Sequence, residues 1–249
     1  MAFKVVIPAR YASSRLPGKP LLQIGNRSLL EHVYRSAASS GASEVVVATD
    51  DQRIADHAAR FGAKVIMTSS EHQSGTDRIQ EALTCLNCAP EEIIVNVQGD
   101  EYGLAPELIS HVATALAENQ SNQMATLCER ITDPAVYTDP NSVKVVMDNS
   151  NTALYFSRAS IPWSKPPLTP FTLLAYKHIG IYAYRAGFLQ VFSKLPHVLL
   201  EQQESLEQLR ALFHGYRIHV AEVPQKTGIE INTAEDLARA RAAWGKTEN

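Results

Sequence analysis

The 249-residue sequence lacks the features of a membrane protein, a secreted protein or a general nucleic-acid binder. No apolar run approaches the ~18 residues that a transmembrane helix needs, so we expect no membrane-spanning segment and no membrane partner. The chain enters an apolar strand without the charged and apolar regions of a signal peptide, which predicts a cytoplasmic protein. A formal net charge of −3 does not favour nucleic-acid binding, so any site for an anion must be local.

Cysteine is also scarce, and the three in the chain are Cys85, Cys88 and Cys128. Cys85 and Cys88 have the spacing of half a zinc site or of a redox pair, but there is no second C-x-x-C and no histidine pair at zinc-finger spacing. The surrounding segment is typical of the end of a helix, with one thiol facing the core and the other the loop. We therefore expect unpaired thiols in a reducing compartment.

The first half of the chain alternates between short apolar runs, typical of buried strands, and segments with helical spacing of apolar residues. The predicted strands are 5–7, 44–48, 64–67, 93–97 and 125–127, and the predicted helices are 28–41, 52–61, one that begins at 74, and 106–119. Continuous apolar runs indicate strands buried on both faces, hence a parallel sheet covered by helices. Ligands bind outside the carboxyl ends of such strands, where the loops after residues 8, 49, 68 and 98 can converge.

The second half has a different pattern. Segments 143–147 and 152–156 flank a turn of Asx and Ser residues at 148–151, which predicts an antiparallel hairpin. Residues 164–171 contain three prolines and predict a loop. Further strands are predicted at 177–184 and 217–223, and further helices at 204–213 and 234–244. No repeat or long linker is present, so a single domain is expected.

The segment 4–22, KVVIPARYASSRLPGKPLL, combines a strand with a loop of small residues. Three cations, Arg10, Arg15 and Lys19, lie in that loop with no acidic residue between them. Backbone N–H groups in such a loop can approach a phosphate group closely. The alternative is an ordinary solvated loop, because neither the G-x-G-x-x-G nor the G-x-x-x-x-G-K-[ST] pattern is present. The residues alone leave both interpretations open.

A carboxylate follows the predicted strand 93–97. Asp100 lies next to Gly99, which lets other groups approach, and can hold a divalent metal together with nucleotide phosphates. A simple tight turn is an equally good interpretation.

Four more residues are also open to a purely structural interpretation. Ser74 and Arg78 lie at a helix start that could be only a cap. Arg158 could pair with a carbonyl or carboxylate of the protein, or its planar guanidinium could bind the carboxylate of an acidic ligand. His178 is by itself more typical of a structural histidine.

The segment 8–21, PARYASSRLPGKPL, resembles the characteristic loop of the 3-deoxy-manno-octulosonate (Kdo) cytidylyltransferases, in the nucleotide-diphospho-sugar transferase-like superfamily. Other blocks resemble the same family in the same order. They are HQSGTDR at 72–78, VQGDE at 97–101, LYFSRASIPW at 154–163, KHIGIYAY at 177–184, LEQLR at 206–210 and TAEDL at 233–237. The resemblance implies an α/β fold with a mostly parallel, Rossmann-like central sheet flanked by helices, and a smaller mixed or antiparallel subdomain for sugar binding and dimerisation.

The resemblance also implies an activity. Such an enzyme transfers CMP from CTP to Kdo and releases pyrophosphate, with Mg²⁺ as cofactor, for lipopolysaccharide biosynthesis. A homodimer is implied as well; segment 179–184 could serve its interface or belong to the core. The single domain would comprise a nucleotide-binding core at about 1–130, a sugar-binding and dimerisation lobe at about 131–225, and a return to the core at about 226–249.

Roles follow for the residues at matching positions. The implied catalytic residues are Arg10, Arg15, Lys19 and Asp100. The implied nucleotide-binding residues are Pro8, Ala9, Arg10, Ser13, Lys19, Ser74, Arg78 and Gln98. The implied sugar-binding residues are Arg158, His178, Tyr182, Glu207 and Gln208, and the implied metal ligands are Asp100 and Asn232. No residue stands out as a general base.

The chain departs from the family pattern at three positions. Asn232 stands where the family has a second metal carboxylate, Ala234 replaces a proline, and Tyr102 replaces the proline after the G-D-E motif. Asn232 can offer a carbonyl oxygen without charge, or Glu230 can compensate. Two alternatives therefore stay open: a cytidylyltransferase for another acidic sugar, such as amino-substituted Kdo or a sialic-acid relative, and a non-catalytic nucleotide-binding protein.

Overall fold

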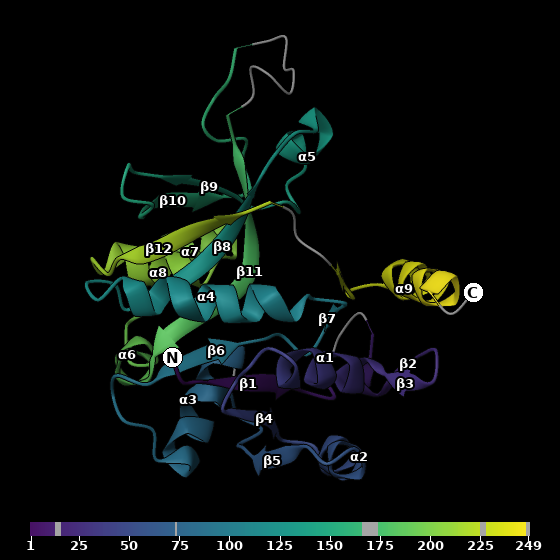
Figure 1. Ribbon diagram of the computed structural model, residues 1–249. Coiled ribbons are helices and arrows are strands. Elements are labelled where there is room, and N and C mark those ends of the chain that lie inside the picture. The colour runs from purple at the N-terminus through teal and green to yellow at the C-terminus, as the bar shows by residue number, and fades with distance from the viewer. Residues whose placement is uncertain (13–15, 73, 166–173, 225–227, 248–249) are drawn as a thin grey trace.

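The computed structural model describes residues 1–12, 16–72, 74–165, 174–224 and 228–247 (Figure 1). Within these residues the chain forms a central sheet of nine strands. Four of them are parallel and lie in the order β5 (Lys64–Met67), β4 (Glu44–Thr49), β1 (Phe3–Ala9) and β6 (Ile93–Asn96). The parallel sheet predicted for the first half is therefore confirmed.

Strands from the second half extend this sheet. β11 (Tyr176–Arg185) is antiparallel to β6 and to β8 (Met124–Arg130), and β12 (Ile218–Val223) is parallel to β8. The predicted hairpin of β9 (Lys144–Met147) and β10 (Ala153–Ser157) joins β11 through β9. Ile179, Ile181 and Ala183 of β11 are at most 3% exposed, so this strand belongs to the core and not to an open interface.

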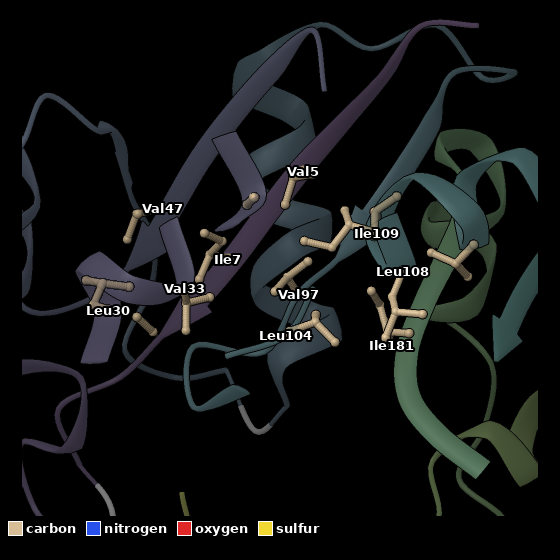
Figure 2. Packing of buried hydrophobic residues seen from close by; sticks show 14 of the residues in the cluster. Val5, Ile7, Leu30, Val33, Val47, Val97, Leu104, Leu108, Ile109 and Ile181 are labelled. Atoms are coloured by element: carbon tan, nitrogen blue, oxygen red, sulfur yellow. The ribbon is translucent and has the colours of Figure 1, made fainter. Parts of the chain in front are cut away.

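Helices cover both faces of the sheet. One core includes α1 (Leu29–Ala38), α2 (Gln52–Arg60) and α4 (Pro106–Glu118), and the other includes α3 (Gly75–Leu86), α6 (Ala186–Phe192) and α8 (Gln208–Phe213). Val5 and Ile7 of β1 point into the first core (Figure 2), whereas Val6 belongs to the second. Adjacent β1 residues thus face opposite cores, which is why this strand is apolar without interruption.

The predicted helix 204–213 is confirmed at residues 208–213, which form α8, but its predicted start is wrong. A separate helix, α7 (Leu199–Glu204), ends where the predicted helix begins, and residues 205–207 separate it from α8. Ser205 has φ +52, in the left-handed region, and this conformation ends α7. The apolar spacing continues across the break, so periodicity did not reveal it.

The short elements were also absent from the prediction, because two to five residues give too little periodicity. They are the 3-10 helix η1 (Lys19–Leu21), the strands β2 (Gln23–Ile24), β3 (Arg27–Ser28), β7 (Glu101–Tyr102) and β13 (Ile229–Glu230), and the helix α5 (Pro134–Thr138). Of the predicted loop 164–171, residues 166–171 lie outside the described ranges.

The last helix, α9 (Ala234–Thr247), packs against the N-terminal half of the chain. Trp244 lies over Gly25, where a Cβ would be 2.0 Å from the indole Nε1. His32 contacts both Trp244 and Tyr102 edge-on, with ring centroids 5.0 and 5.1 Å apart. Tyr102, which departs from the family pattern, therefore joins the packing that holds α9 beside α1.

The three cysteines are free thiols, as predicted. Cys85 on α3 is exposed, and Cys88 in the next loop packs half-buried against the second core. Burial raises the pKa of Cys128 to about 12, which makes it an unreactive core residue. In the part of the chain that the structure describes, no helix has the length and apolar character to cross a bilayer.

Candidate functional site

A cavity of about 290 Å³ opens where the parallel strands end. The loops after residues 8, 68 and 98 line it, as predicted, and the loop after residue 49 contacts the wall through Asp50. The lining residues are Pro8, Ala9, Arg10, Lys19, Pro20, His72, Ser74, Gly75, Arg78, Gln98, Gly99, Asp100 and Asn232. The cavity thus brings together the predicted nucleotide-binding and metal-binding residues, except Ser13, which, like Arg15, lies outside the described ranges.

The loop after β1 is held by its own backbone and by α2. The Gly18 N–H donates to the Tyr11 carbonyl at 3.0 Å, and Gly18 has φ +67, a conformation that glycine adopts at little cost. The Tyr11 ring lies 3.3 Å from the Arg53 guanidinium carbon. Arg53 in turn pairs with Asp51, with 2.6 Å between Nη2 and Oδ2. Helix α2 therefore supports the loop that carries Arg10 and Lys19.

Lys19, Asp100 and Asn232 meet at one end of the cavity. Lys19 Nζ lies 2.6 Å from Asp100 Oδ2 and 3.5 Å from Asn232 Oδ1. The Lys19 and Asp100 side chains are 14% and 21% exposed, so this ion pair is sheltered yet accessible from the cavity. The Ile231 N–H donates to the Asp100 carbonyl at 2.9 Å, beside the antiparallel pair of β7 and β13. Tertiary structure thus joins two segments that are far apart in sequence.

The oxygen atoms of Asp100 and Asn232 suit a magnesium ion. Mg²⁺ is usually held by one or two carboxylates together with substrate phosphates and water. Among the described residues, no group of three or more His, Cys, Asp or Glu side chains forms a metal cage. Glu230, the alternative ligand, accepts a hydrogen bond from Asn232 Nδ2 at 2.6 Å. The arrangement fits an ion shared with a phosphate ligand.

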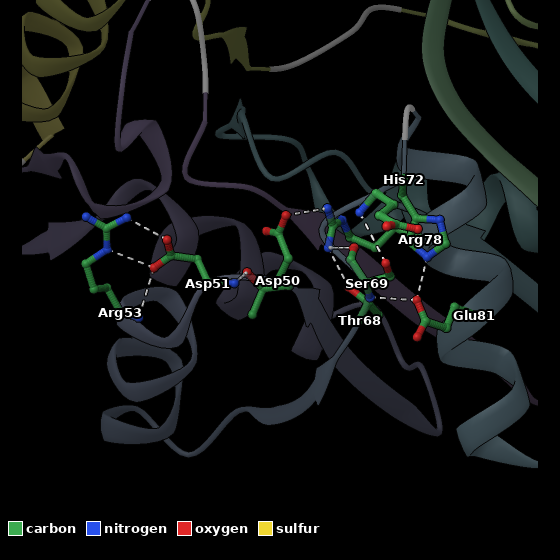
Figure 3. A network of polar contacts seen from close by, with 10 residues as sticks. Asp50, Asp51, Arg53, Thr68, Ser69, His72, Arg78 and Glu81 are labelled. Atoms are coloured by element: carbon green, nitrogen blue, oxygen red, sulfur yellow. Dashed lines mark hydrogen bonds and ion pairs between the residues drawn. The ribbon is translucent and has the colours of Figure 1, made fainter.

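Arg78 forms the wall of the cavity at the start of α3. It is 3% exposed, and its Nη2 donates to Asp50 Oδ2 at 3.0 Å while Nη1 donates to Thr68 Oγ1 (Figure 3). Ser74 Oγ caps α3 by accepting from the Asp77 N–H at 3.1 Å. Both side chains thus have structural partners and still face the cavity. Their role in nucleotide binding stays a prediction.

Three of the predicted sugar-binding residues, Tyr182, Glu207 and Gln208, form a partly buried polar cluster beside α3. Glu207 accepts from Thr76 Oγ1 at 2.7 Å and from Arg210 Nη2 at 2.9 Å. Burial raises the pKa of Glu207, although the Thr76 hydrogen bond and the Arg210 charge oppose that rise. Within the described ranges, the Tyr182 hydroxyl and Gln208 Nε2 are buried without a hydrogen-bond partner. Such orphaned polar atoms mark a place for a ligand or water.

His178 lines a second cavity, of about 430 Å³, which shares Gln98 with the first. Its Nε2 lies 3.0 Å from Thr126 Oγ1, and its ring contacts Phe156 and Tyr182. The side chain is thus both packed and adjacent to a cavity.

Arg158 lies apart from both cavities. Its Nε donates to the Glu204 carbonyl at 2.8 Å and its Nη1 to the Pro140 carbonyl at 3.0 Å. Lys144 is fully buried and donates to the Arg158 carbonyl at 2.7 Å. The contacts match the structural alternative for Arg158, and its role with the sugar stays a prediction.

Several residues at the first cavity were not predicted from the sequence. His72 and Gly75 lie inside a matching block, so the block itself was the available signal. Asp50 neutralises Arg78 from the loop after β4, and its pairing depends on tertiary contact alone.

A capping box fixes Asn232 at the start of α9. Asp236 Oδ2 accepts from the N–H groups of Asn232 and Thr233 at 2.9 and 2.8 Å, and Thr233 Oγ1 accepts from the Asp236 N–H at 3.2 Å. Burial alone would raise the pKa of Asp236, but these hydrogen bonds and Arg239 lower it from 3.8 to about 2.

This pKa shift predicts a pH-dependent contribution to stability. Because the folded pKa is depressed, the stabilisation is complete above pH 3.8 and is lost as the pH falls towards about 2. We expect Asp236→Ala to reduce the unfolding free energy by about 1–2 kcal/mol at pH 6, and the difference from wild type to shrink below pH 4. Urea unfolding from pH 2 to 6 measures it. Glu235→Gln, exposed and adjacent, is the control, and a pH-independent difference would contradict the prediction.

The model of the family described as "Cytidylyltransferase" matches residues 4–218. A 3-deoxy-manno-octulosonate cytidylyltransferase of Idiomarina loihiensis is 51% identical, covering 98% of this chain and 99% of that protein. One of Pseudomonas fluorescens is 49% identical, covering 98% of each.

Solved structures are similar as well. A CMP:2-keto-3-deoxy-manno-octonic acid synthetase complexed with CTP is 42% identical, with a TM-score of 0.90 and 99% of each chain covered. A Bacillus anthracis protein described as a glucose-1-phosphate thymidylyltransferase is 16% identical, with a TM-score of 0.66 over 98% of this chain and 95% of that one. The second likeness concerns the fold alone.

Proposed function

We propose that this chain, which belongs to the cytidylyltransferase family, transfers CMP from CTP to 3-deoxy-manno-octulosonate (Kdo) and releases pyrophosphate. The observation that carries the proposal is the cavity that groups Arg10, Lys19, Arg78 and Asp100, in a chain similar over nearly its whole length to Kdo cytidylyltransferases. The similar structure that was solved with CTP supports CTP as the donor.

In the proposed reaction the anomeric hydroxyl of the sugar attacks the α-phosphorus of CTP. A new oxygen–phosphorus bond forms, the bond between the α- and β-phosphates breaks, and pyrophosphate leaves. Arg10 and Lys19 bring positive charge to the triphosphate, where charge develops on the phosphate oxygens in the transition state. The cavity mainly positions the reactants, because no described side chain is singled out as a base for the hydroxyl proton.

Asp100 and Asn232 would hold Mg²⁺ together with the triphosphate. When bound, the ion neutralises phosphate charge and lowers the pKa of a coordinated hydroxyl. The acid and amide offer it oxygen ligands, and Lys19, now 2.6 Å from Asp100, would be free to contact phosphate once that carboxylate has a metal partner.

The sugar would lie between Gln98 and the cluster of Tyr182, Glu207 and Gln208. The unpartnered Tyr182 hydroxyl and Gln208 Nε2 provide polar atoms for sugar hydroxyls. Burial raises the pKa of Tyr182 well above its usual value, so its phenol stays a neutral hydrogen-bond donor. His178 would close the site from the side of the second cavity. Arg158 would act indirectly, since the Glu204 and Pro140 carbonyls already accept from it.

The direct experiment is pyrophosphate release from CTP with a panel of acidic sugars. We expect turnover with Kdo and Mg²⁺, and at least a tenfold lower kcat/KM with amino-substituted Kdo or sialic acid. A reversed preference would favour the alternative substrate, and no turnover with any sugar at saturating Mg²⁺ would favour the non-catalytic alternative.

The proposal extends to a homodimer in the cytoplasm that serves lipopolysaccharide synthesis. Leu154 on β10 and Trp163 in the segment that follows β10 are 62% and 79% exposed. Such side chains would be covered if they belong to a contiguous apolar patch at the dimer interface. Light scattering after gel filtration measures the mass, and a monomeric mass would remove the dimer from the proposal.

Gly99 provides a test of how closely the loop after β6 must approach the end of β1. A Cβ at this position would lie 2.9 Å from the Pro8 carbonyl oxygen, which is backbone and cannot easily move. We expect Gly99→Ala to lower kcat/KM about tenfold or more and the unfolding free energy by about 1–3 kcal/mol. The control is Gly75→Ala, whose nearest neighbour would be Pro8 Cγ at 3.4 Å. Initial rates and denaturant unfolding measure both, and equal activity of the two variants would contradict the prediction.

A further inference from the structure

We propose that Glu230 is a positioning residue: its carboxylate holds the Asn232 side-chain amide with the carbonyl oxygen turned towards Lys19, the partner of Asp100. Glu230 and Asn232 are then a matched acid–amide pair that completes the end of the cavity where Lys19 and Asp100 meet. The inference rests on the proposed function, because it concerns the ion that the triphosphate would bring.

The hydrogen bonds give the amide its direction. Asn232 Nδ2 donates to Glu230 Oε1 at 2.6 Å, and on the other side Oδ1 accepts from Lys19 Nζ at 3.5 Å. A carboxylate only accepts hydrogen bonds and an ammonium only donates them. Rotating the amide by half a turn would place oxygen against oxygen and NH₂ against ammonium. The pair therefore selects the orientation that offers an oxygen ligand.

Hydrogen bonds fix the main chain at Asn232 and just before it, so rotation of the side-chain amide is the main conformational freedom that remains. The Asn232 N–H donates to Asp236 Oδ2 at 2.9 Å, and the preceding Ile231 N–H donates to the Asp100 carbonyl at 2.9 Å. Glu230 is itself paired in register with Glu101 across β13 and β7. Because the main chain is held on both sides, the Glu230 carboxylate decides which end of the amide faces the site.

The same geometry predicts that a carboxylate at position 232 does not fit beside Glu230. In an Asn232→Asp variant, two carboxylate oxygens would face each other across the 2.6 Å that the hydrogen bond now spans. Like charges at such a distance repel, so the added negative charge would not strengthen metal binding. Replacing Glu230 by glutamine at the same time removes the repulsion and restores a hydrogen-bond donor.

The experiment measures Mn²⁺ retention by the full-length protein in equilibrium dialysis at fixed CTP concentration. We expect Glu230→Ala to weaken Mn²⁺ binding about threefold to tenfold, and Glu230→Gln, whose amide oxygen still accepts from Asn232, to stay within about twofold of wild type. Asn232→Asp alone should bind no more tightly than wild type. The Glu230→Gln/Asn232→Asp double variant should bind at least fivefold more tightly. Glu235→Gln, exposed and nearby, controls for the loss of one negative charge.

Two results with the variants, and one with the wild type, would overturn the inference. One is wild-type Mn²⁺ binding by Glu230→Ala, and the other is tighter binding by Asn232→Asp while Glu230 is present. A wild-type protein that retains no Mn²⁺ with CTP also overturns it. Pyrophosphate release with Kdo is assayed in parallel: the predicted order of Mn²⁺ affinities without turnover would reject the proposed function and leave the pairing of Glu230 with Asn232 intact.

Discussion

Lys19→Ala is expected to lower kcat/KM for CTP by about 10²–10³-fold, with little loss of stability. The Lys19 side chain is 14% exposed and lies at the cavity wall, where a fixed positive charge stabilises the phosphate oxygens in the transition state. Its loss leaves Asp100 without its cation, but that carboxylate still faces the open cavity. We therefore expect the unfolding free energy to change by about 1 kcal/mol or less. Initial rates of pyrophosphate release and urea unfolding measure the two effects.

The matched control is Lys64→Ala. Lys64 is also paired with an acid, Glu44, at 2.5 Å, but it is 55% exposed at the edge of the sheet, away from the cavity. Its removal should leave turnover unchanged. Wild-type pyrophosphate release by Lys19→Ala would reject the role of this lysine, and a large stability loss would show that it acts through the fold.

Asp100→Asn is expected to lower turnover by about 10³-fold and to weaken Mn²⁺ binding in the presence of CTP. The substitution keeps the size of the side chain but removes the single charged ligand from the pair of Asp100 and Asn232. It also leaves Lys19 without the carboxylate that now lies 2.6 Å away. Because both the metal and the lysine depend on this carboxylate, the effect should exceed that of Lys19→Ala.

Rates at increasing Mg²⁺ concentration measure this effect, with Mn²⁺ dialysis as the second readout. Glu107→Gln is the control, since Glu107 is an exposed acid in the first turn of α4 and outside the cavity. If Asp100→Asn binds Mn²⁺ like the wild type, Asp100 is not a metal ligand and the assignment of this end of the cavity fails.

Much of the fold was predictable because its strands carry continuous apolar runs. The runs at β1, β4, β5 and β6 indicated a parallel sheet, and its topology then places the following loops at one edge. That is why the loops after residues 8 and 98 could be assigned to one site in advance. The break at Ser205 and the short strands β7 and β13 were not predictable, since each depends on a local backbone conformation or on a partner strand far away in sequence.

The candidate site, like the fold, has features that the sequence predicts and features that depend on tertiary contacts. The sequence by itself determined which residue types are present in each loop: the cations of segment 4–22, the acid after β6, the capped start of α3, and an asparagine where the family has an aspartate. Only the tertiary structure decided what these groups contact. It pairs Lys19 with Asp100, places Arg158 against two backbone carbonyls, and brings the Asn232 amide within 3.5 Å of Lys19. The physical reason is that hydrogen bonds and ion pairs act over a few ångströms, and Lys19, Asp100 and Asn232 come that close only when β7, β13 and α9 pack beside the first loop.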